Sequence, residues 1–165
     1  MKKIKDTSPD KVHGKLVKYR RGDCLSIHCG DKYLGVLISR KFNKYYDLTL
    51  IEYYNDKNPE ISDFRKGKFF GTRFGSWEDL TYAVNVRMIN CTYIDNNLDI
   101  EKVGSLNLIS TIRHDGYSYF DTTEQLLEYY LEELPIRTEK SKNAEKIPDL
   151  AFVNKHLIDT THIIE

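Results

Sequence analysis

The chain has 165 residues, of which 40% are hydrophobic and 30% are charged, values typical of a single globular domain with a core of its own. Its 25 basic and 25 acidic residues cancel, which argues against nucleic acid or a membrane surface as a partner. The three cysteines lack the spacing of a zinc site or a disulfide framework. No apolar run has the form of a signal peptide or a membrane span. We therefore expect a cytoplasmic protein with reduced thiols, no metal and no cofactor.

The predicted domain has a less regular segment on each side. Residues 1–15 are polar and basic and contain Pro9 and Gly14, so we expect a flexible basic arm. A single β-rich domain is predicted over residues 16–135. Residues 136–165 are expected to be a charged linker that ends in a short C-terminal segment with spaced apolar side chains.

Three β-rich runs form the centre of the predicted domain, at residues 23–29, 33–41 and 45–54. The turns between them are so short that neighbouring strands have to pair antiparallel, because a parallel crossover needs a dozen or more residues. An Arg-Gly-Asp turn at residues 21–23 leads into the first run. The middle run is apolar on both faces, which predicts a central strand, and Gly35 within it predicts a bulge or close packing by an aromatic neighbour.

Further strands are predicted after this meander. The aromatic and glycine-rich stretch 69–77 is expected to form a short, bent strand. In residues 82–94 the apolar positions switch phase after Met88, which predicts a bulge in one long strand. Residues 97–103 are expected to be a linker, and residues 104–112 the last strand.

One helix is predicted over residues 122–134. Asp121 followed by Glu124 has the pattern of a helix-capping pair, apolar residues recur at helical spacing, and Pro135 ends the pattern. Together these elements predict an α+β fold. We expect a coiled, mostly antiparallel β-sheet or half-open barrel of about six strands, with one packed C-terminal helix.

No arrangement of side chains in the sequence identifies catalytic residues. Cys24 and His28 share one face of the first strand, but a separation of about 13 Å at ~3.3 Å per residue is too long for a shared proton. The stretch 64–74 places four basic residues among four phenylalanines. That pattern fits either a nucleic-acid surface or an aromatic core.

Two stretches near the start of the predicted domain resemble a known family. The turn and strand at residues 19–27, followed by Lys32-Tyr33-Leu34-Gly35-Val36-Leu37, resemble the opening of bacterial immunity proteins of the immunity protein 26 type. In that family a Lys/Arg-x-Gly-Asp turn leads into an apolar strand. Residues 103–108 resemble its short final strand, so the resemblance covers about residues 16–112.

The resemblance implies a protein that needs no cofactor and neutralises a cognate polymorphic toxin by binding it. A rigid β scaffold would cover the active site or substrate groove of the toxin, with acids against a basic groove and aromatic side chains as anchors. The predicted partner-binding residues are the acids Asp95, Asp99 and Glu101 and the aromatic residues Tyr53, Tyr54 and Trp77. Two alternatives stay open: a β-barrel module that binds nucleic acid or a small ligand, and an enzyme.

Overall fold

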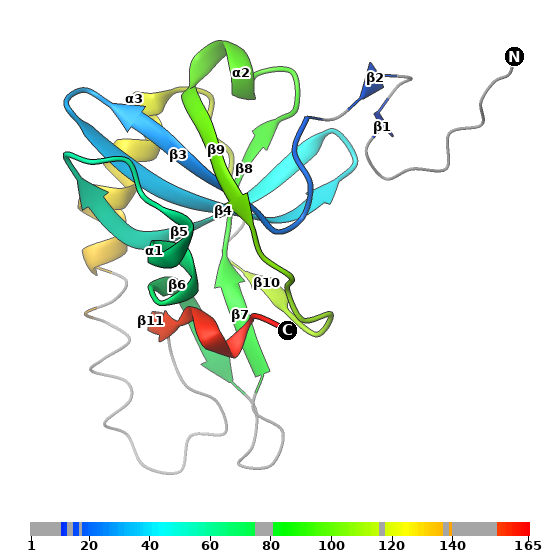
Figure 1. The fold of residues 1–165 in the computed structure, drawn as a ribbon, viewed down its shortest axis with the longest axis vertical. Helices are drawn as coiled ribbons and strands as arrows, with labels where there is room; N and C mark the ends of the chain where they lie inside the picture. The colour runs from blue at the N-terminus through cyan, green and yellow to red at the C-terminus, as the bar shows by residue number, and fades with distance from the viewer. Residues whose placement is uncertain are drawn as a thin grey trace, which may run out of the picture.

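The computed structural model describes residues 11–12, 15–16, 18–74, 81–115, 118–136, 139 and 155–165. Figure 1 shows how the elements are arranged. The strands are β1 (Lys11–Val12), β2 (Lys15–Leu16), β3 (Asp23–Cys29), β4 (Lys32–Phe42), β5 (Tyr45–Asn55), β6 (Lys68–Phe74), β7 (Thr81–Asn85), β8 (Arg87–Asn90), β9 (Asp99–Ser105), β10 (Arg113–Asp115) and β11 (Lys155–Asp159). The helices are α1 (Ile61–Arg65), α2 (Ile94–Asn97) and α3 (Thr123–Glu128), with a π-helical turn η1 (Tyr129–Glu133) and a 3-10 turn η2 (Thr160–His162).

The protein has the predicted α+β fold, built on one open and mostly antiparallel sheet. The order of its main path is β10-β7-β6-β5-β4-β3-β9, while β8 pairs with β5 and β11 pairs with β6. The pairing of β10 with β7 is parallel. In the described residues the sheet has nine strands rather than about six. The number is higher because one predicted strand is divided, a predicted linker is a strand, and β10 and the C-terminal β11 add two more, while the strand predicted over residues 104–112, all of which the structure describes, is absent.

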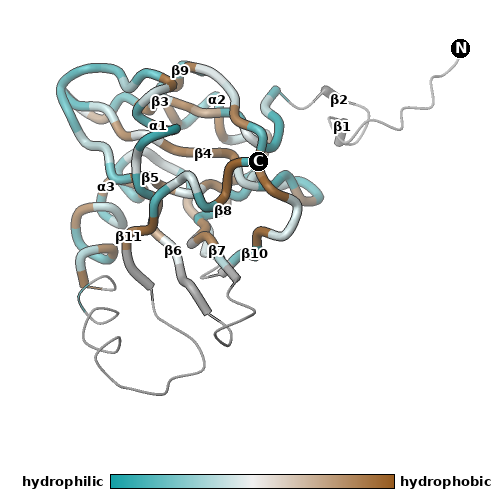
Figure 2. The backbone as a smooth tube through the Cα atoms, turned by 60° about the horizontal axis from the view of Figure 1, so that its bottom comes forward, coloured by the Kyte–Doolittle hydropathy of each residue, from teal (hydrophilic) through white to brown (hydrophobic). Residues whose placement is uncertain are grey.

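The three central strands pair as their short turns require. β3 and β5 lie antiparallel on either side of β4, and Figure 2 shows the hydrophobic part of β4 (brown) running through the molecule. Both predictions for Gly35 are confirmed. The register of β4 against β5 shifts between Leu34 and Val36, and a Cβ atom at Gly35 would lie 3.3 Å from Cζ of the aromatic ring of Phe64. Side-chain atoms of Ile51 would lie closer still, at 2.9 Å.

The sheet buries hydrophobic side chains on both of its faces. On one face, Leu25 of β3 belongs to a core cluster with Leu126 and Tyr129 of the C-terminal helix. On the other face, Cys24 of β3 belongs to a second cluster with Phe64 of α1. Neighbouring residues of β3 therefore enter different clusters, as the alternation of side chains in a strand requires.

The predicted strand over residues 82–94 consists of two strands with different partners. β7 pairs with β6, whereas β8 pairs with β5. Val86 lies between them and is fully buried, with 0% of its surface exposed. The switch in apolar phase thus accompanies a change of partner strand, and the prediction of one bulged strand was wrong.

The predictions of a linker at residues 97–103 and of a last strand at 104–112 were also wrong. β9 covers residues 99–105 and pairs antiparallel with β3 at the edge of the sheet. Its side chains are exposed or only half buried, so it lacks the apolar alternation from which strands are predicted. After Ser105 the chain is largely irregular, although Leu106 and Leu108 are buried.

The helix near the C-terminus is capped differently from the prediction. Thr122 is its N-cap, because Thr122 Oγ1 accepts a hydrogen bond from the backbone N–H of Gln125 at 3.2 Å. Gln125 Oε1 in turn accepts from the backbone N–H of Asp121 at 2.6 Å. The capping pair is therefore Thr122 and Gln125, one residue later than Asp121 and Glu124.

The C-terminal segment returns to the sheet. β11 lies antiparallel to β6, and Ile158 and Ile163 are buried in the second cluster. Residues 1–10, the predicted anchor Trp77 and most of the predicted linker lie outside the described residues. None of the helices in the described part of the chain is both long and apolar enough to cross a membrane.

Candidate functional site

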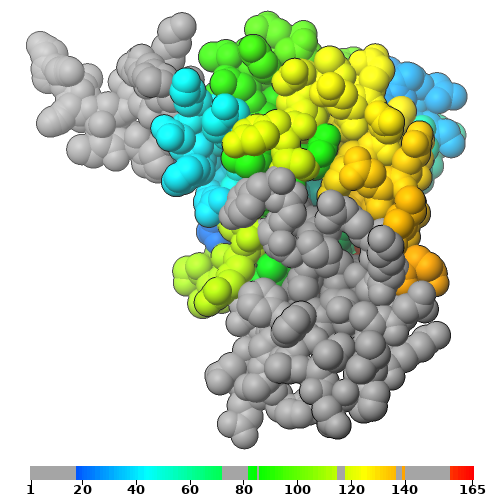
Figure 3. Space-filling model, turned by 180° about the vertical axis from the view of Figure 1, so that it is seen from behind, coloured from blue at the N-terminus to red at the C-terminus, as the bar shows by residue number. Residues whose placement is uncertain are grey.

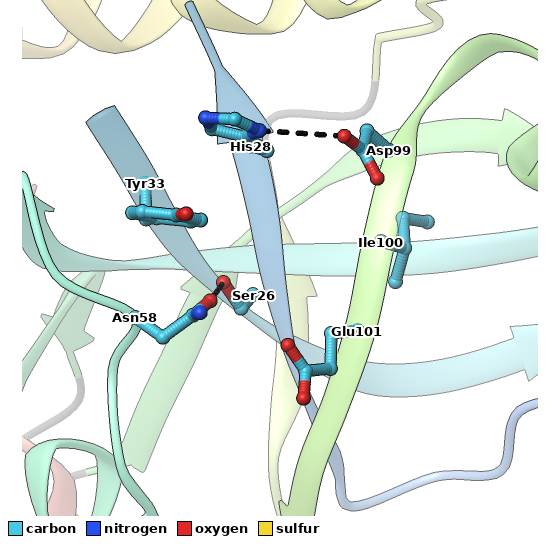
Figure 4. A pocket seen from close by; sticks show the side chains of 7 residues that line it. All are labelled: Ser26, His28, Tyr33, Asn58, Asp99, Ile100 and Glu101. Atoms are coloured by element: carbon cyan, nitrogen blue, oxygen red, sulfur yellow. Dashed lines mark hydrogen bonds and ion pairs between the residues drawn. The ribbon is translucent and has the colours of Figure 1, made fainter. Parts of the chain in front are cut away.

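A pocket of about 150 Å³ lies on one face of β3, between β4 on one side and the edge strand β9 on the other. Figure 4 shows the side chains that surround it. The lining residues are Ser26, His28, Tyr33, Asn58, Asp99, Ile100 and Glu101. They come from three adjacent strands and from the loop between β5 and α1.

The register of the strands positions these side chains. His28 lies opposite Tyr33 of β4 and opposite Asp99 of β9. Two residues earlier, Ser26 lies opposite Gly35 and Glu101. Because residues directly opposite one another project from the same face of a sheet, these pairs form two parallel rows. The pocket is thus a direct consequence of the pairing of β9 with β3.

The first row contains a stacked aromatic pair and an acid. The rings of His28 and Tyr33 stack with their centroids 4.5 Å apart and an interplanar angle of 13°. Nδ1 of His28 lies 3.3 Å from Oδ2 of Asp99. Since an ionised carboxylate only accepts hydrogen bonds, Nδ1 carries the proton of this bond. The side chain of Asp99 is 78% exposed, so the carboxylate remains accessible from solvent.

The second row joins a buried hydroxyl to an exposed acid. Ser26 is 1% exposed, and its Oγ donates a hydrogen bond to Oδ1 of Asn58 at 2.6 Å. Glu101, opposite Ser26, is exposed. The hydroxyl of Ser26 thereby holds the loop of Asn58 against the sheet, while Glu101 adds a second negative charge to the rim.

The geometry supports binding rather than nucleophilic chemistry. Ser26 and His28 are two residues apart on one strand, about 7 Å between their Cα atoms, which is too long for His28 to take the hydroxyl proton of Ser26 directly. Cys24 is the next residue on this face, but burial, together with the charge of Asp23, raises the pKa of its thiol to about 12. Two carboxylates beside a flat aromatic pair instead suit a cation.

The structure brings two of the three predicted acids together. Asp99 and Glu101 both line the pocket. Asp95 lies in α2 and has other partners: its carboxylate accepts from the hydroxyl of Tyr19 at 3.2 Å and pairs with Lys18 at 3.2 Å. The partner-binding prediction for Asp95 therefore concerns a different part of the surface.

Tyr53 and Tyr54, the two predicted aromatic anchors that the structure describes, do not line the pocket. The hydroxyl of Tyr53 donates to the backbone carbonyl of Lys57 at 2.5 Å. Tyr54 packs beside Tyr130, with ring centroids 5.8 Å apart, and carries Lys32 Nζ 5.3 Å from its ring centre. The third predicted anchor lies outside the described residues, as noted above.

Sequence reasoning missed five residues of the pocket: Ser26, His28, Tyr33, Asn58 and Ile100. The alternation of β3 already places Ser26 and His28 on one face. The sequence does not predict the strand β9 beside them, because residues 97–103 have the pattern of a linker. Without β9, the sequence does not predict that Asp99 and Glu101 lie beside His28 and Ser26.

Three of the four phenylalanines in the stretch 64–74 belong to the core and not to a nucleic-acid surface. Phe64 and Phe69 are fully buried, and Phe70 is 8% exposed. Aromatic rings buried in this way cannot stack on bases. The core interpretation of this stretch is therefore the right one for these three residues.

Exposed aromatic residues gather instead at the end of the β4–β5 hairpin. Phe42 is 56% exposed and Tyr119 is 62% exposed, and the rings of Tyr45 and Tyr119 meet edge to face at 5.1 Å. Figure 3 shows the hairpin around residue 42 (cyan) beside the segment around residue 119 (yellow). The guanidinium of Arg40 lies 5.3 Å from the ring centre of Phe42. We call Phe42, Tyr45 and Tyr119 the aromatic edge.

A further polar group is buried where β4 and β5 pair. Asp47 is fully buried, and its Oδ2 accepts from Nε of Arg40 at 2.8 Å. Ser39 Oγ donates to the backbone carbonyl of Asp47 and accepts from Thr49 Oγ1, each at 3.1 Å. Burial raises the pKa of Asp47, and the hydrogen bond and charge of Arg40 only partly oppose this effect. These bonds fix the hairpin that carries Phe42 and Tyr45 of the aromatic edge.

Comparisons of the chain with protein-family models, with curated proteins and with solved structures give no match.

Proposed function

We propose that this protein neutralises a cognate bacterial toxin domain in the cytoplasm by binding it and covering its active site or substrate groove. The observation that carries the proposal is the pocket on β3, where Asp99 and Glu101 stand beside the stacked rings of His28 and Tyr33. The resemblance of residues 16–112 to immunity proteins supplies the class of partner. No bond is made or broken in this function.

The sheet suits such a function because it holds the charged rim in a fixed geometry. The hydrogen bonds of Ser26 and His28 hold the loop and the edge strand in place before the partner arrives. Binding then costs little conformational entropy at this surface. Acids on a rigid rim also attract a basic groove at a distance, which speeds association and favours the right partner over others.

The experiment uses the toxin domain encoded beside this gene. That domain is expressed from an inducible promoter in a bacterial host, with or without this protein, and growth is followed. We expect growth to be restored only when this protein is present. A gene neighbourhood without a toxin gene, or toxicity that this protein leaves unchanged, would contradict the proposal.

A charge-removing variant then tests the surface. Replacing Asp99→Asn together with Glu101→Gln should weaken toxin binding, measured by calorimetry, by about ten-fold or more. The matched control is Glu132→Gln with Glu133→Gln, since both acids are exposed on the C-terminal helix. Equal affinities in the two variants would reject the pocket as the contact surface.

The aromatic edge favours a second candidate function, the binding of single-stranded nucleic acid. Its exposed rings are accompanied by Lys41 and Lys44 on the same hairpin, and Asp47, the acid nearest the turn, is buried and paired with Arg40. Bases stack on exposed aromatic rings while cations contact the phosphates. The function would be independent of the pocket, which lies near the other end of β4.

Fluorescence anisotropy with a labelled single-stranded oligonucleotide distinguishes the two candidates. Binding that falls with salt and is lost on Phe42→Ala with Tyr119→Ala would support the second function. Binding that these substitutions leave unchanged, or an unchanged signal at high protein concentration, would reject it.

A further inference from the structure

We propose that the pocket on β3 binds a guanidinium group, the head group of an arginine side chain, and discriminates it from the ammonium group of lysine. The inference rests on the proposed function only for the source of the guanidinium group, which would be an arginine of the protein partner. The pocket itself can be tested without any toxin.

The charges on the rim attract a cation. Asp99 and Glu101 are two residues apart on β9 and line the same pocket. His28 occupies Oδ2 of Asp99, and the other carboxylate oxygen still has its acceptor capacity. The nearest cation on the strand, Lys102, is directed to Asp23, with its Nζ 3.2 Å from Oδ1. Its charge is therefore engaged at another carboxylate.

The shape of the pocket suits a planar cation. The rings of His28 and Tyr33 are stacked face to face, 13° from parallel with their centroids 4.5 Å apart, so the outer face of each ring is a flat surface that the other ring does not cover. A guanidinium stacks on such a surface while its edge donates to two acceptors at once, whereas an ammonium is a compact and strongly hydrated charge. The same packing occurs inside this protein, where the guanidinium of Arg87 lies 4.4 Å from the ring centre of Tyr129.

The size of the pocket agrees with a small head group. A volume of about 150 Å³ holds about five water molecules at ~30 Å³ each. By volume, the four heavy atoms of a guanidinium fit that space. Hydrogen bonds from such a group to Asp99 and Glu101 would replace those of the displaced water.

The test is an NMR titration of the full chain with Nα-acetylargininamide, followed through the backbone amide signals. We expect shifts at His28, Tyr33 and Glu101, and an affinity about five-fold higher than for Nα-acetyllysinamide, because an exposed charge contact with added stacking is worth about 1 kcal/mol. Calcium chloride serves as a third probe for simple cation binding.

Four variants test the roles of charge and stacking. Glu101→Gln should weaken arginine binding by about three- to five-fold, whereas Glu132→Gln, the same substitution on the C-terminal helix, should leave it unchanged. Tyr33→Phe should keep the preference for arginine because it keeps the ring. Tyr33→Ala should remove that preference, leaving arginine and lysine equal.

Three results would overturn the inference: equal affinities for the two amides in the unaltered protein, stronger shifts with calcium at the same residues, or no shift at these residues. The outcome is separate from that of the toxin experiment. If the protein binds arginine but gives no protection from toxicity, the proposed function is rejected and the guanidinium pocket stands. If it protects from toxicity but does not bind arginine, the proposed function stands and this ligand is rejected.

Discussion

Asp23 and Ser105 are joined by a hydrogen bond of 2.8 Å from Ser105 Oγ to Asp23 Oδ1, although 82 residues separate them in the chain. Oδ2 of the same carboxylate accepts from the backbone N–H of Arg20 at 2.8 Å. Asp23 is only 3% exposed. The Arg-Gly-Asp turn therefore has a structural role. It closes the turn before β3 and fastens the end of β9 to it.

The first prediction concerns this carboxylate. Asp23→Ala should lower the free energy of unfolding by about 3 kcal/mol, because it removes a charged acceptor from two partly buried hydrogen bonds, from Ser105 Oγ and from the backbone N–H of Arg20. Ser105→Ala removes one neutral donor and should cost about 1 kcal/mol. Urea denaturation followed by circular dichroism measures both values. Equal losses for the two variants would mean that Asp23 serves only as the partner of Ser105.

The second prediction concerns the close contact at Gly35. A Cβ atom there would lie 2.9 Å from Cδ1 and Cγ1 of Ile51 and 3.3 Å from Cζ of Phe64. Gly35→Ala should therefore destabilise the protein by about 1–3 kcal/mol through overpacking. Ile51→Val removes one of the two opposing atoms of Ile51.

A double-mutant cycle checks this explanation. The double variant Gly35→Ala with Ile51→Val should be more stable than the sum of the two single losses, by about 0.5 kcal/mol or more. Strict additivity, measured by urea denaturation, would show that the contact with Ile51 is not the cause of the loss.

Distance along the chain explains both why the central strands could be predicted and why β9 could not. The pairing of β3, β4 and β5 could be predicted because turns of two or three residues leave only one way to pair. β9 could not, because it pairs with β3 across more than seventy residues, as His28 and Asp99 illustrate. An edge strand also needs only weak apolar alternation, since water solvates its outer side. The pocket depends on the pairing of β9 with β3, so it could not be predicted from the sequence either.

The third prediction concerns Arg87, which joins β8 to the C-terminal helix. Its guanidinium lies 4.4 Å from the ring centre of Tyr129 and 5.6 Å from that of Phe120, and its Nη1 donates to Ser118 Oγ at 2.6 Å. Arg87→Lys keeps the charge but loses the planar stacking and the directed hydrogen bond. We expect a loss of about 1–2 kcal/mol in the free energy of unfolding.

The control for Arg87 is Arg65→Lys, the same substitution at an exposed position at the end of α1. Its effect on the free energy of unfolding should stay within about 0.5 kcal/mol. If the two variants unfold at the same urea concentration, charge alone accounts for the contribution of Arg87.

The last prediction concerns the pH dependence of stability. Burial lowers the pKa of His114 to about 4 from its ordinary value of 6.5, and the positive charge of Arg40 adds to this, although a hydrogen bond to the backbone of Ser39 opposes it. Between these pH values the unfolded chain binds a proton that the folded protein does not. The contribution of His114 is therefore fully present above pH 6.5 and is lost as the pH falls towards 4.

A shift of this size corresponds to about 3 kcal/mol for a fully buried group, and we expect about 2 kcal/mol because the ring is only partly buried. Asp47 acts in the opposite sense, since its raised pKa favours the folded state in acid. The measurement therefore compares the loss of stability of the unaltered protein with that of a variant that lacks His114. Urea denaturation is repeated from about pH 7 to about pH 4.5 for the unaltered protein and for His114→Gln, which cannot bind the proton. The unaltered protein should lose more stability than the variant over this range, and parallel curves would place the titrating group elsewhere.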